Sequence, residues 1–359
     1  MAAEPTRRDY SLIGRDSKLA QQRGLATAQW YACALPRKRL KELMQRRDGP
    51  AICDTLIWIA AFIVTGGLAW HFWGSWWAVP FFAAYGVLHG SSSDSRWHEC
   101  GHGTAFRTRW MNDVIYHIAC FMILREPTVW RWSHTRHHTD TIIVGRDPEI
   151  AVPRPPDILG ILLNLFALKS SAAAIRKLLL HTTGQLTAEE ATFIPEMERR
   201  KVYLVARIWV AVYAAVVTSC FAFGTILPAM FVGLPTLYGG WLTIVFGLTQ
   251  HAGLAEDVLD HRLNSRTVYM NPVLRFLYWN MNYHIEHHMY PMVPYHALPA
   301  LHEALKADMP RASNGLWEAY CEILPALLRQ VKEPGYYVQR ALPASAGPFA
   351  PKLAATGAG

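Results

Sequence analysis

The sequence predicts an all-α integral membrane protein, with four transmembrane helices in two hairpins and a cytoplasmic helical cap that is rich in histidine. Three observations support this fold class. Apolar runs reach the ~20 residues that cross ~30 Å of hydrocarbon. Lysine and arginine are absent from two long windows, each of which has the length of a helical hairpin. Three short histidine clusters lie outside these windows, where one side of a membrane would gather them.

The first 30 residues are polar and charged, without an apolar core near their start, so they predict a mobile arm and no cleaved signal peptide. A basic stretch around Arg37–Lys41 precedes the first apolar run. That run predicts a span near 51–70, and a second span follows near 72–89. The tryptophan-rich bend between them suits a membrane interface.

The second hairpin is predicted from spans near 208–223 and 229–248. No Lys or Arg occurs between Arg207 and Arg262, as none occurs in the window of the first hairpin. By the positive-inside rule, the segments that flank the two hairpins are all cytoplasmic. We therefore expect all three histidine clusters to lie on the cytoplasmic side of the membrane.

Two further apolar segments do not read as spans. The segment near 111–124 is too short to cross, and the segment near 158–180 carries three basic residues in its second half, so both predict interfacial helices. Residues 341–359 form an Ala/Pro/Gly tail without periodicity, which predicts disorder. Residues 31–340 then make one domain.

Composition excludes several classes of protein. The formal net charge is +8, but the basic residues flank apolar segments and form no patch with interleaved aromatics, so nucleic acid is not an expected partner. The six cysteines include no C-x-x-C pair, so neither a disulfide framework nor a thiolate zinc site is indicated.

The histidine clusters are the main functional signal. They read H-E-x-x-H from His98, H-x-x-H-H from His134 and H-x-x-H-H from His284. Because residues three or four apart share one face of a helix, each cluster can aim its rings at a common point. Eight imidazoles are enough for more than one metal ion, and His251, after the last predicted span, is a candidate ninth ligand. Imidazole suits iron, copper, zinc and nickel, so ligand type does not identify the metal.

Other interpretations of these histidines remain open. His98-Glu99-x-x-His102 alone is the signature of zinc proteases, in which the glutamate activates water. A haem held by two imidazoles is a second alternative. The histidines outside the clusters predict ordinary structural or surface roles: His71, His117, His181, His261, His296 and His302.

The three clusters, in this order and between two apolar hairpins, resemble those of the membrane fatty acid desaturase family and its hydroxylase relatives, over roughly residues 58–299. The chain looks like a bacterial member and also resembles the hydrocarbon oxygenase of rhizopine catabolism, so we expect it in a bacterial inner membrane with its active site on the cytoplasmic side. The resemblance implies two non-haem iron ions that use O₂ to attack an unactivated C–H bond of an acyl lipid or hydrocarbon. Desaturation is the leading expectation, and hydroxylation or oxidative demethylation the alternative. Carried over by position, the ligands would be His98, His102, His134, His137, His138, His251, His284, His287 and His288.

Electrons have to come from an external donor, since no dinucleotide fingerprint, ferredoxin cysteine run or haem module occurs in the sequence. A ferredoxin or rubredoxin with its reductase is the expected partner, and arginines of the cap would attract an acidic carrier. Trp130–Trp132 either lines the approach to the metals, passes electrons or anchors the cap at the interface. Five acids near the clusters are candidates to accept the second N–H of a ligand ring: Glu99, Glu286, Asp94, Asp140 and Asp147.

Overall fold

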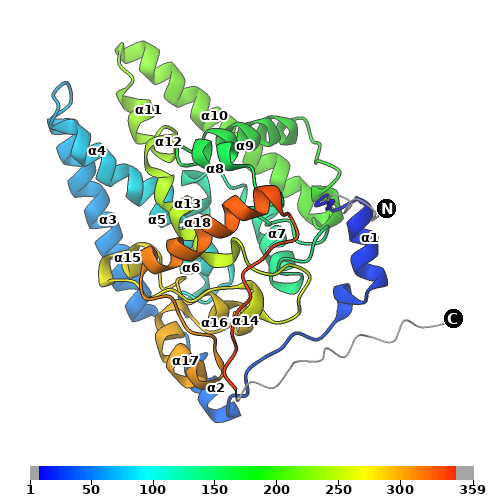
Figure 1. The fold of residues 1–359 in the computed structure, drawn as a ribbon. Coiled ribbons are helices and arrows are strands. Elements are labelled where there is room, and N and C mark those ends of the chain that lie inside the picture. Colours follow the sequence, from blue (N-terminus) through cyan, green and yellow to red (C-terminus); the bar gives the residue numbers. More distant parts are fainter. Residues whose placement is uncertain (1–7, 345–359) are drawn as a thin grey trace.

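The computed structural model describes residues 8–344, and this part of the chain is helical, with two isolated β-bridges and no longer strand. Figure 1 shows α3 with α4, and α10 with α11, projecting from the same side of a helical cap. The α-helices are α1 (Arg15–Gln22), α2 (Arg37–Leu43), α3 (Asp48–His71), α4 (Ala78–Gly86), α5 (Ser92–Gly101), α6 (Arg109–Met122), α7 (Pro127–Thr139), α8 (Ile158–Asn164), α9 (Leu168–Thr182), α10 (Arg199–Phe223), α11 (Leu227–Phe231), α12 (Pro235–Gly239), α13 (Trp241–His251), α14 (His261–Asn264), α15 (Pro272–Leu277), α16 (His284–Met289), α17 (Leu298–Leu305) and α18 (Leu316–Lys332). Short 3₁₀ segments are η1 (Leu25–Thr27), η3 (Glu190–Thr192), η4 (Glu196–Glu198), η5 (Tyr295–Ala297) and η6 (Lys306–Asp308), and η2 (Val87–Ser91) is π-helical.

Two helices of the described chain are long and apolar enough to cross a membrane. They run within Arg37–His71 and Glu196–Phe223 and contain the predicted first and third spans. The 24 residues of α3 rise ~36 Å at ~1.5 Å per residue. Large apolar side chains such as Ile63 and Phe221 are exposed along these helices. Such side chains are what a lipid environment would cover.

The predicted second and fourth spans are interrupted in the structure. Residues 72–89 contain a turn, then α4, and then the start of η2, which continues into α5. Residues 229–248 pass through α11, α12 and most of α13, none longer than 11 residues. The described chain therefore has two straight candidate spans, or three if α8 and α9, bent by 79° to each other, count as one.

Glycines allow the two interrupted segments to pack backbone against backbone. Gly239 touches the backbone of Gly86 so closely that a Cβ would overlap it, and a Cβ at Gly90 would lie 2.8 Å from the Gly240 nitrogen. The Ser91 hydroxyl donates to the Gly239 carbonyl at 2.6 Å. Because glycine has no side chain, the two backbones come close enough here for this bond to form.

This crossing leads to a stability prediction. Gly239→Ala would place a methyl group against rigid backbone, and overpacking of this kind costs about 1–3 kcal/mol or more. We expect a clear fall in the midpoint of thermal unfolding, measured in detergent by thiol-reactive fluorescence. Gly67→Ala is the control, because a Cβ there meets nothing within 4 Å. Equal midpoints for both variants would contradict the described crossing.

The cap is built around one large apolar core beneath α5, α6 and the C-terminal helices. Its buried members include Trp97, Tyr116, Trp279, Met281 and Leu301. The predicted interfacial segment 111–124 falls on α6, and 158–180 falls on α8 and α9. The core fixes the ends of the helices that carry the histidine clusters.

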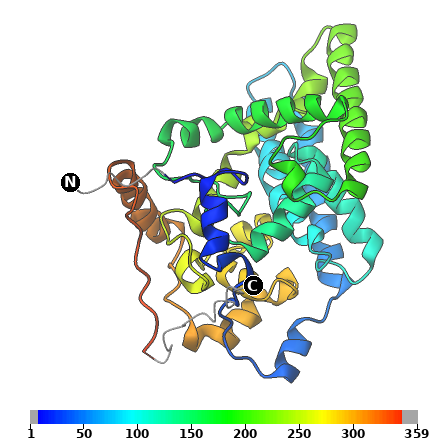
Figure 2. The same cartoon turned by 90° about the vertical axis from the view of Figure 1, so that its right-hand side faces the viewer.

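Residues 8–30, expected to form an arm, lie against the cap (Figure 2). The Arg8 guanidinium is 2.5 Å from the Glu256 carboxylate, and the Tyr10 hydroxyl donates to Glu256 at 2.9 Å. A Cβ at Gly145 would overlap the backbone of Ser17, so α1 packs directly on the loop after α7. Residues 1–7 and the predicted tail from 345 to 359 lie outside the described residues, and residues 341–344 form no helix.

Candidate metal centre

Three short helices carry the histidine clusters. His98 lies on α5 and His102 at its C-cap, one turn apart on the same face. α7 starts at Pro127, where the side chain of Glu126 accepts a hydrogen bond from the Val129 N–H at 2.6 Å and so caps the helix. The third cluster occupies α16, and the candidate ninth histidine ends α13.

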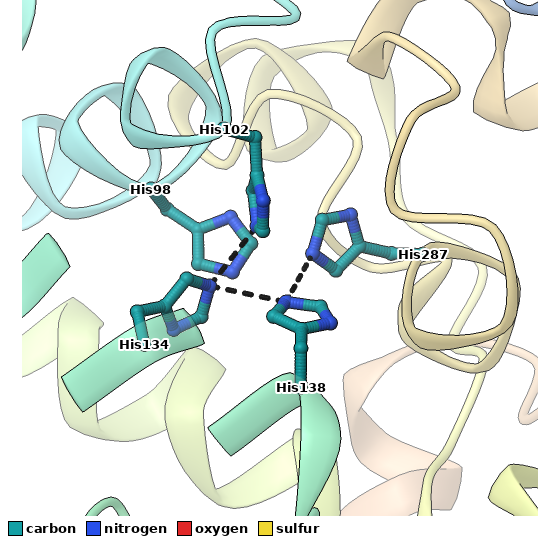
Figure 3. Close-up of side chains that lie close together, drawn as sticks. All are labelled: His98, His102, His134, His138 and His287. Carbon is teal, nitrogen blue, oxygen red and sulfur yellow. Dashed lines mark hydrogen bonds between the residues drawn. The ribbon is translucent and has the colours of Figure 1, made fainter. Parts of the chain in front are cut away.

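The structure brings all nine predicted histidines together in two groups. In each group, one ring nitrogen from every member lies within 4.8 Å of the others. Figure 3 shows the first group, whose rings come from α5, α7 and α16 and point toward one another. The five-histidine group contains His98, His102, His134, His138 and His287, and the four-histidine group contains His137, His251, His284 and His288.

The closest approaches within each group join Nε2 atoms. In the five-histidine group, His134 Nε2 lies 3.1 Å from Nε2 of both His102 and His138. In the four-histidine group, His284 Nε2 lies 3.0 Å from Nε2 of both His251 and His288. Each group therefore has several nitrogens directed at one small volume.

The tautomers of these rings indicate a cation between them. His251 Nδ1 lies 2.8 Å from the Asn264 carbonyl oxygen, which can only accept, so this Nδ1 carries the proton. The Thr141 hydroxyl donates to the His137 carbonyl and therefore accepts from His288 Nδ1 at 3.2 Å. The Nε2 atoms of both rings are left as bare acceptors. Bare acceptors repel one another unless they share a positive ion, so the donor set fits a metal.

Burial keeps most of these rings in the neutral form that binds metal. It lowers the pKa of His102 to about 4. Burial, reinforced by neighbouring imidazoles, also holds the pKa of six other rings well below the usual value: His98, His134, His138, His284, His287 and His288. The pKa of His137 is raised instead, because the Asp147 carboxylate outweighs the effect of burial.

Two carboxylates orient rings of the second cluster. Asp147 Oδ2 lies 2.8 Å from His137 Nδ1, and Glu149 Oε2 lies 2.9 Å from His134 Nδ1. Such partners fix the tautomer and make the other ring nitrogen a better ligand. Burial raises the pKa of Glu149 to about 7. A metal ion on the far side of the imidazole would favour the charged form of this carboxylate.

Of the five acids suggested by sequence, only Asp147 is hydrogen bonded to a clustered ring. Glu99 Oε1 lies 3.5 Å from His98 Nδ1 and 3.6 Å from His287 Nδ1, beyond hydrogen-bond distance. Glu286 instead binds His302 Nδ1 at 2.5 Å. The other two acids pair with arginines: Asp94 with Arg125, and Asp140 with Arg146.

Glu149 was missed by sequence reasoning. It lies 11 positions beyond His138, and the chain returns to α7 because a tight turn follows the helix, with Gly145 at φ +74°. The available signal was the Asp147-Pro148-Glu149 sequence directly after a glycine turn. A turn that reverses the chain places such acids beside the preceding helix.

The histidines given structural roles lie outside both groups. His181 Nε2 binds Glu190 at 3.0 Å, and His302 is enclosed by Glu286 and Tyr269, so these two are partnered inside the cap. His261 differs, because its ring lies 5.1 Å, centroid to centroid, from that of His288. It therefore touches the four-histidine group without belonging to it.

Two cavities approach the metal centre. The one nearer the rings has a volume of about 360 Å³, and its lining includes His98, His251 and the apolar Ile244. The other, of about 440 Å³, extends along α9 to Lys177. The two share Ile244, Trp130 and Asn164 in their walls, so together they describe a path from α9 to the histidines.

The position of Glu99 argues against a zinc protease. Its Oε2 accepts hydrogen bonds from the Tyr295 N–H at 3.2 Å and the Thr104 hydroxyl at 3.4 Å, and the residue is fully buried. The glutamate of a protease must face a metal-bound water. A catalytic zinc also uses three protein ligands, fewer than either histidine group offers.

Comparison with known proteins agrees with the geometry. A family model described as fatty acid desaturase matches residues 73–320, which include all three clusters. The chain is 26% identical over 266 residues to the chloroplastic omega-3 fatty acid desaturase of Ricinus communis, covering 67% of this chain and 56% of the relative. It is 27% identical over 287 residues to a probable fatty acid desaturase of Sorghum bicolor, covering 70% and 68%.

The omega-3 fatty acid desaturase of the endoplasmic reticulum of Nicotiana tabacum is 27% identical over 278 residues, covering 71% of this chain and 69% of the relative. The chain thus spans little more than half to about two thirds of the length of these relatives. Two similar proteins of Arabidopsis thaliana carry the names of electron donors, one cytochrome b5 and the other ferredoxin.

Proposed function

This chain belongs to the fatty acid desaturase family, and we propose on that premise that it is an O₂-dependent oxidoreductase that introduces a double bond into the acyl chain of a membrane lipid. The observation that carries the proposal is the meeting of nine histidines in two adjacent groups. Groups of five and four imidazoles divide between two metal ions and leave a coordination position for oxygen. The nine histidines would then be the metal ligands.

Two non-haem iron ions are the metals we propose. Imidazole is a common iron ligand, and the two groups contain no thiolate to favour zinc or an iron–sulfur cluster. When bound, the iron pair would supply the oxidising power that removes hydrogen from an unactivated C–H bond. Around it, Asp147 and Glu149 hold two rings in register, and burial keeps the rings neutral.

The reaction requires electrons as well as oxygen. One acyl CH₂–CH₂ unit, O₂, two electrons and two protons give one CH=CH unit and two water molecules. The protein's part is to hold the acyl chain beside the metal pair and to exclude bulk water. Burial of the histidine groups under α5, α7 and α16 serves the second task.

The two cavities would hold the substrate. Beside the rings, the lining contains apolar side chains such as Ile150, Ile161 and Leu248, which suit methylene groups. Farther out, Lys177 and Ser170 on α9 give the path a polar end. We infer that the acyl chain lies along this path, with its polar head at the α9 end.

The membrane arrangement follows from the same premise. We propose that the two straight spans and the two interrupted segments together form the four predicted crossings, with the glycine contact of Gly86 and Gly239 joining them. The absence of Lys and Arg from both windows supports a cytoplasmic cap. The names of the plant relatives refer to chloroplast and endoplasmic reticulum. A bacterial inner membrane therefore stays a prediction for this chain.

An external protein would supply the electrons. The names of two relatives specify ferredoxin and cytochrome b5, both one-electron carriers. A rubredoxin remains the further candidate from sequence. The rate at which each carrier reduces the iron-loaded protein would show which of them is the donor.

Lipid mass spectrometry tests the function. Expression of the intact chain in a host that lacks the activity is expected to yield lipids whose acyl chains have lost two hydrogens. The variant His98→Ala serves as the inactive control for background desaturation. Products that have gained one oxygen, or lost a methyl group, would identify a hydroxylase or a demethylase and refute desaturation.

A further inference from the structure

A short stack of aromatic rings joins the surface of the cap to the four-histidine group. The indole of Trp30 lies parallel to the imidazole of His261, with centroids 4.3 Å apart and planes 5° apart. The His261 ring lies 5.1 Å from the ring of His288, a proposed ligand. His261 is only 3% exposed, whereas Trp30 is half-buried and so reaches solvent.

Trp30 is held in this position by both neighbouring segments. Its Nε1–H donates to the carbonyl of Thr139, the last residue of α7, at 3.0 Å. The next backbone N–H, of Tyr31, donates to the Leu259 carbonyl at 2.9 Å. The indole is therefore fixed at once to the helix of the second cluster and to the loop before α14.

A surface groove lies beside the same point. Its volume is about 560 Å³, and it runs between α1 and α7 with Thr139 in its wall. Arg136 and Arg146 also line it, against one acid, Asp140. On the α1 side, Lys18 is exposed one turn from Gln21, which faces the groove. The groove therefore has an excess of positive charge.

We propose that an acidic one-electron carrier protein docks on this groove, and that electrons pass through Trp30 and His261 to the metal held by the four-histidine group. This inference rests on the proposed function. The rate of electron transfer falls steeply with the distance between the two redox groups. Two aromatic rings in contact transmit electrons over such a distance better than saturated side chains do. Charge complementarity would speed the encounter, as in other weak redox complexes.

The electron balance is simple. In each encounter one reduced carrier loses one electron, and the metal site gains it. Two encounters supply the two electrons that one turnover consumes. The rings of Trp30 and His261 act only as the medium, so neither is left oxidised or reduced.

The test is reduction of the oxidised, iron-loaded protein under anaerobic conditions. Reoxidation of photoreduced [2Fe–2S] ferredoxin is followed by its visible absorption, and dithionite with methyl viologen provides a donor that needs no docking. Trp30→Leu is expected to lose the fast phase with ferredoxin while keeping its iron and its rate with methyl viologen. Trp30→Phe, which keeps an aromatic ring, should retain the fast phase. Trp317→Leu is the matched control and should keep the wild-type rate with both donors, because Trp317 is an exposed tryptophan that does not line the groove.

Two results would overturn the path. One is ferredoxin oxidation by Trp30→Leu at the wild-type rate. The other is equal slowing with both donors, with or without loss of iron, which would give Trp30 a structural role. Cytochrome b5 is tested in parallel, and reduction by either carrier must depend on Trp30. If the wild-type protein accepts electrons but forms no unsaturated lipid, desaturation fails and the path stands.

Charge reversal on α1 provides a second test that leaves the fold intact. Lys18 is exposed and one turn from Gln21 in the groove, so Lys18→Glu should change the charge at the groove without disturbing the core. We expect association with ferredoxin to slow by about tenfold at low salt and to converge with wild type at high salt. The same salt dependence in variant and wild type would refute docking at this groove.

Discussion

Replacement of His287 by alanine is expected to abolish both metal binding at the five-histidine group and the formation of unsaturated lipid. The His287 side chain is fully buried, and its Nε2 lies 3.1 Å from His138 Nε2. Loss of the ring removes one of five donors and leaves a cavity at a buried position. Iron per chain, measured on the purified protein, should fall together with product.

His117→Ala is the control for this substitution. His117 is exposed on α6 and belongs to neither histidine group. Its loss should leave iron content and product at wild-type levels. A His287→Ala protein that keeps two irons per chain and full product would refute the ligand assignment.

The second large effect is expected at Asp147. Its Oδ2 accepts hydrogen bonds from His137 Nδ1 and from the Ile142 N–H, and its Oδ1 accepts from the Glu149 N–H. In Asp147→Asn, one of the two carboxylate oxygens becomes an NH₂ group. Because each oxygen accepts from an N–H group, the NH₂ group would face a donor, and at least one of these hydrogen bonds is lost. Removal of such a partner typically lowers metal affinity about 10- to 100-fold. Competition with an iron chelator measures this change directly.

Asp140→Asn is the matched control. Asp140 is also buried and close to α7, but it pairs with Arg146 and Arg136 rather than with a ring of the metal centre. We expect its iron to resist the chelator as in the wild-type protein. If both variants lose iron equally, the effect comes from the loop after α7 and not from the Asp147 contact with His137.

The histidines could be predicted from sequence because helical spacing fixes them locally. His134 and His138 are four residues apart, so any helix through them presents both rings on one side. His251 was predicted from its place after an apolar run and from the resemblance to relatives. Which acids bind the second nitrogen of each ring depends on where the chain folds back against the histidine helices, and local spacing does not determine this. Glu149 reaches His134 only because of the turn at Gly145.

The spans show the limits of hydropathy. Length and apolar content correctly identified the long helices that contain residues 51–70 and 208–223. The same two properties do not show whether an apolar segment forms one continuous helix or several short ones. The π-helical turn that contains Gly90 and the change from α12 to α13 at Gly240 lie where the backbones of segments about 150 residues apart touch. A sequence window cannot contain such a contact. The same holds for residues 8–30, whose ion pairs reach Glu256 and Asp257 across most of the chain.

Metal analysis of the purified protein tests the central claim most directly, which is that histidines far apart in sequence together hold a pair of iron ions. Elemental analysis with an absorption spectrum should give about two irons per chain, no zinc and no haem band. One zinc per chain, or iron present only as haem, would contradict the account.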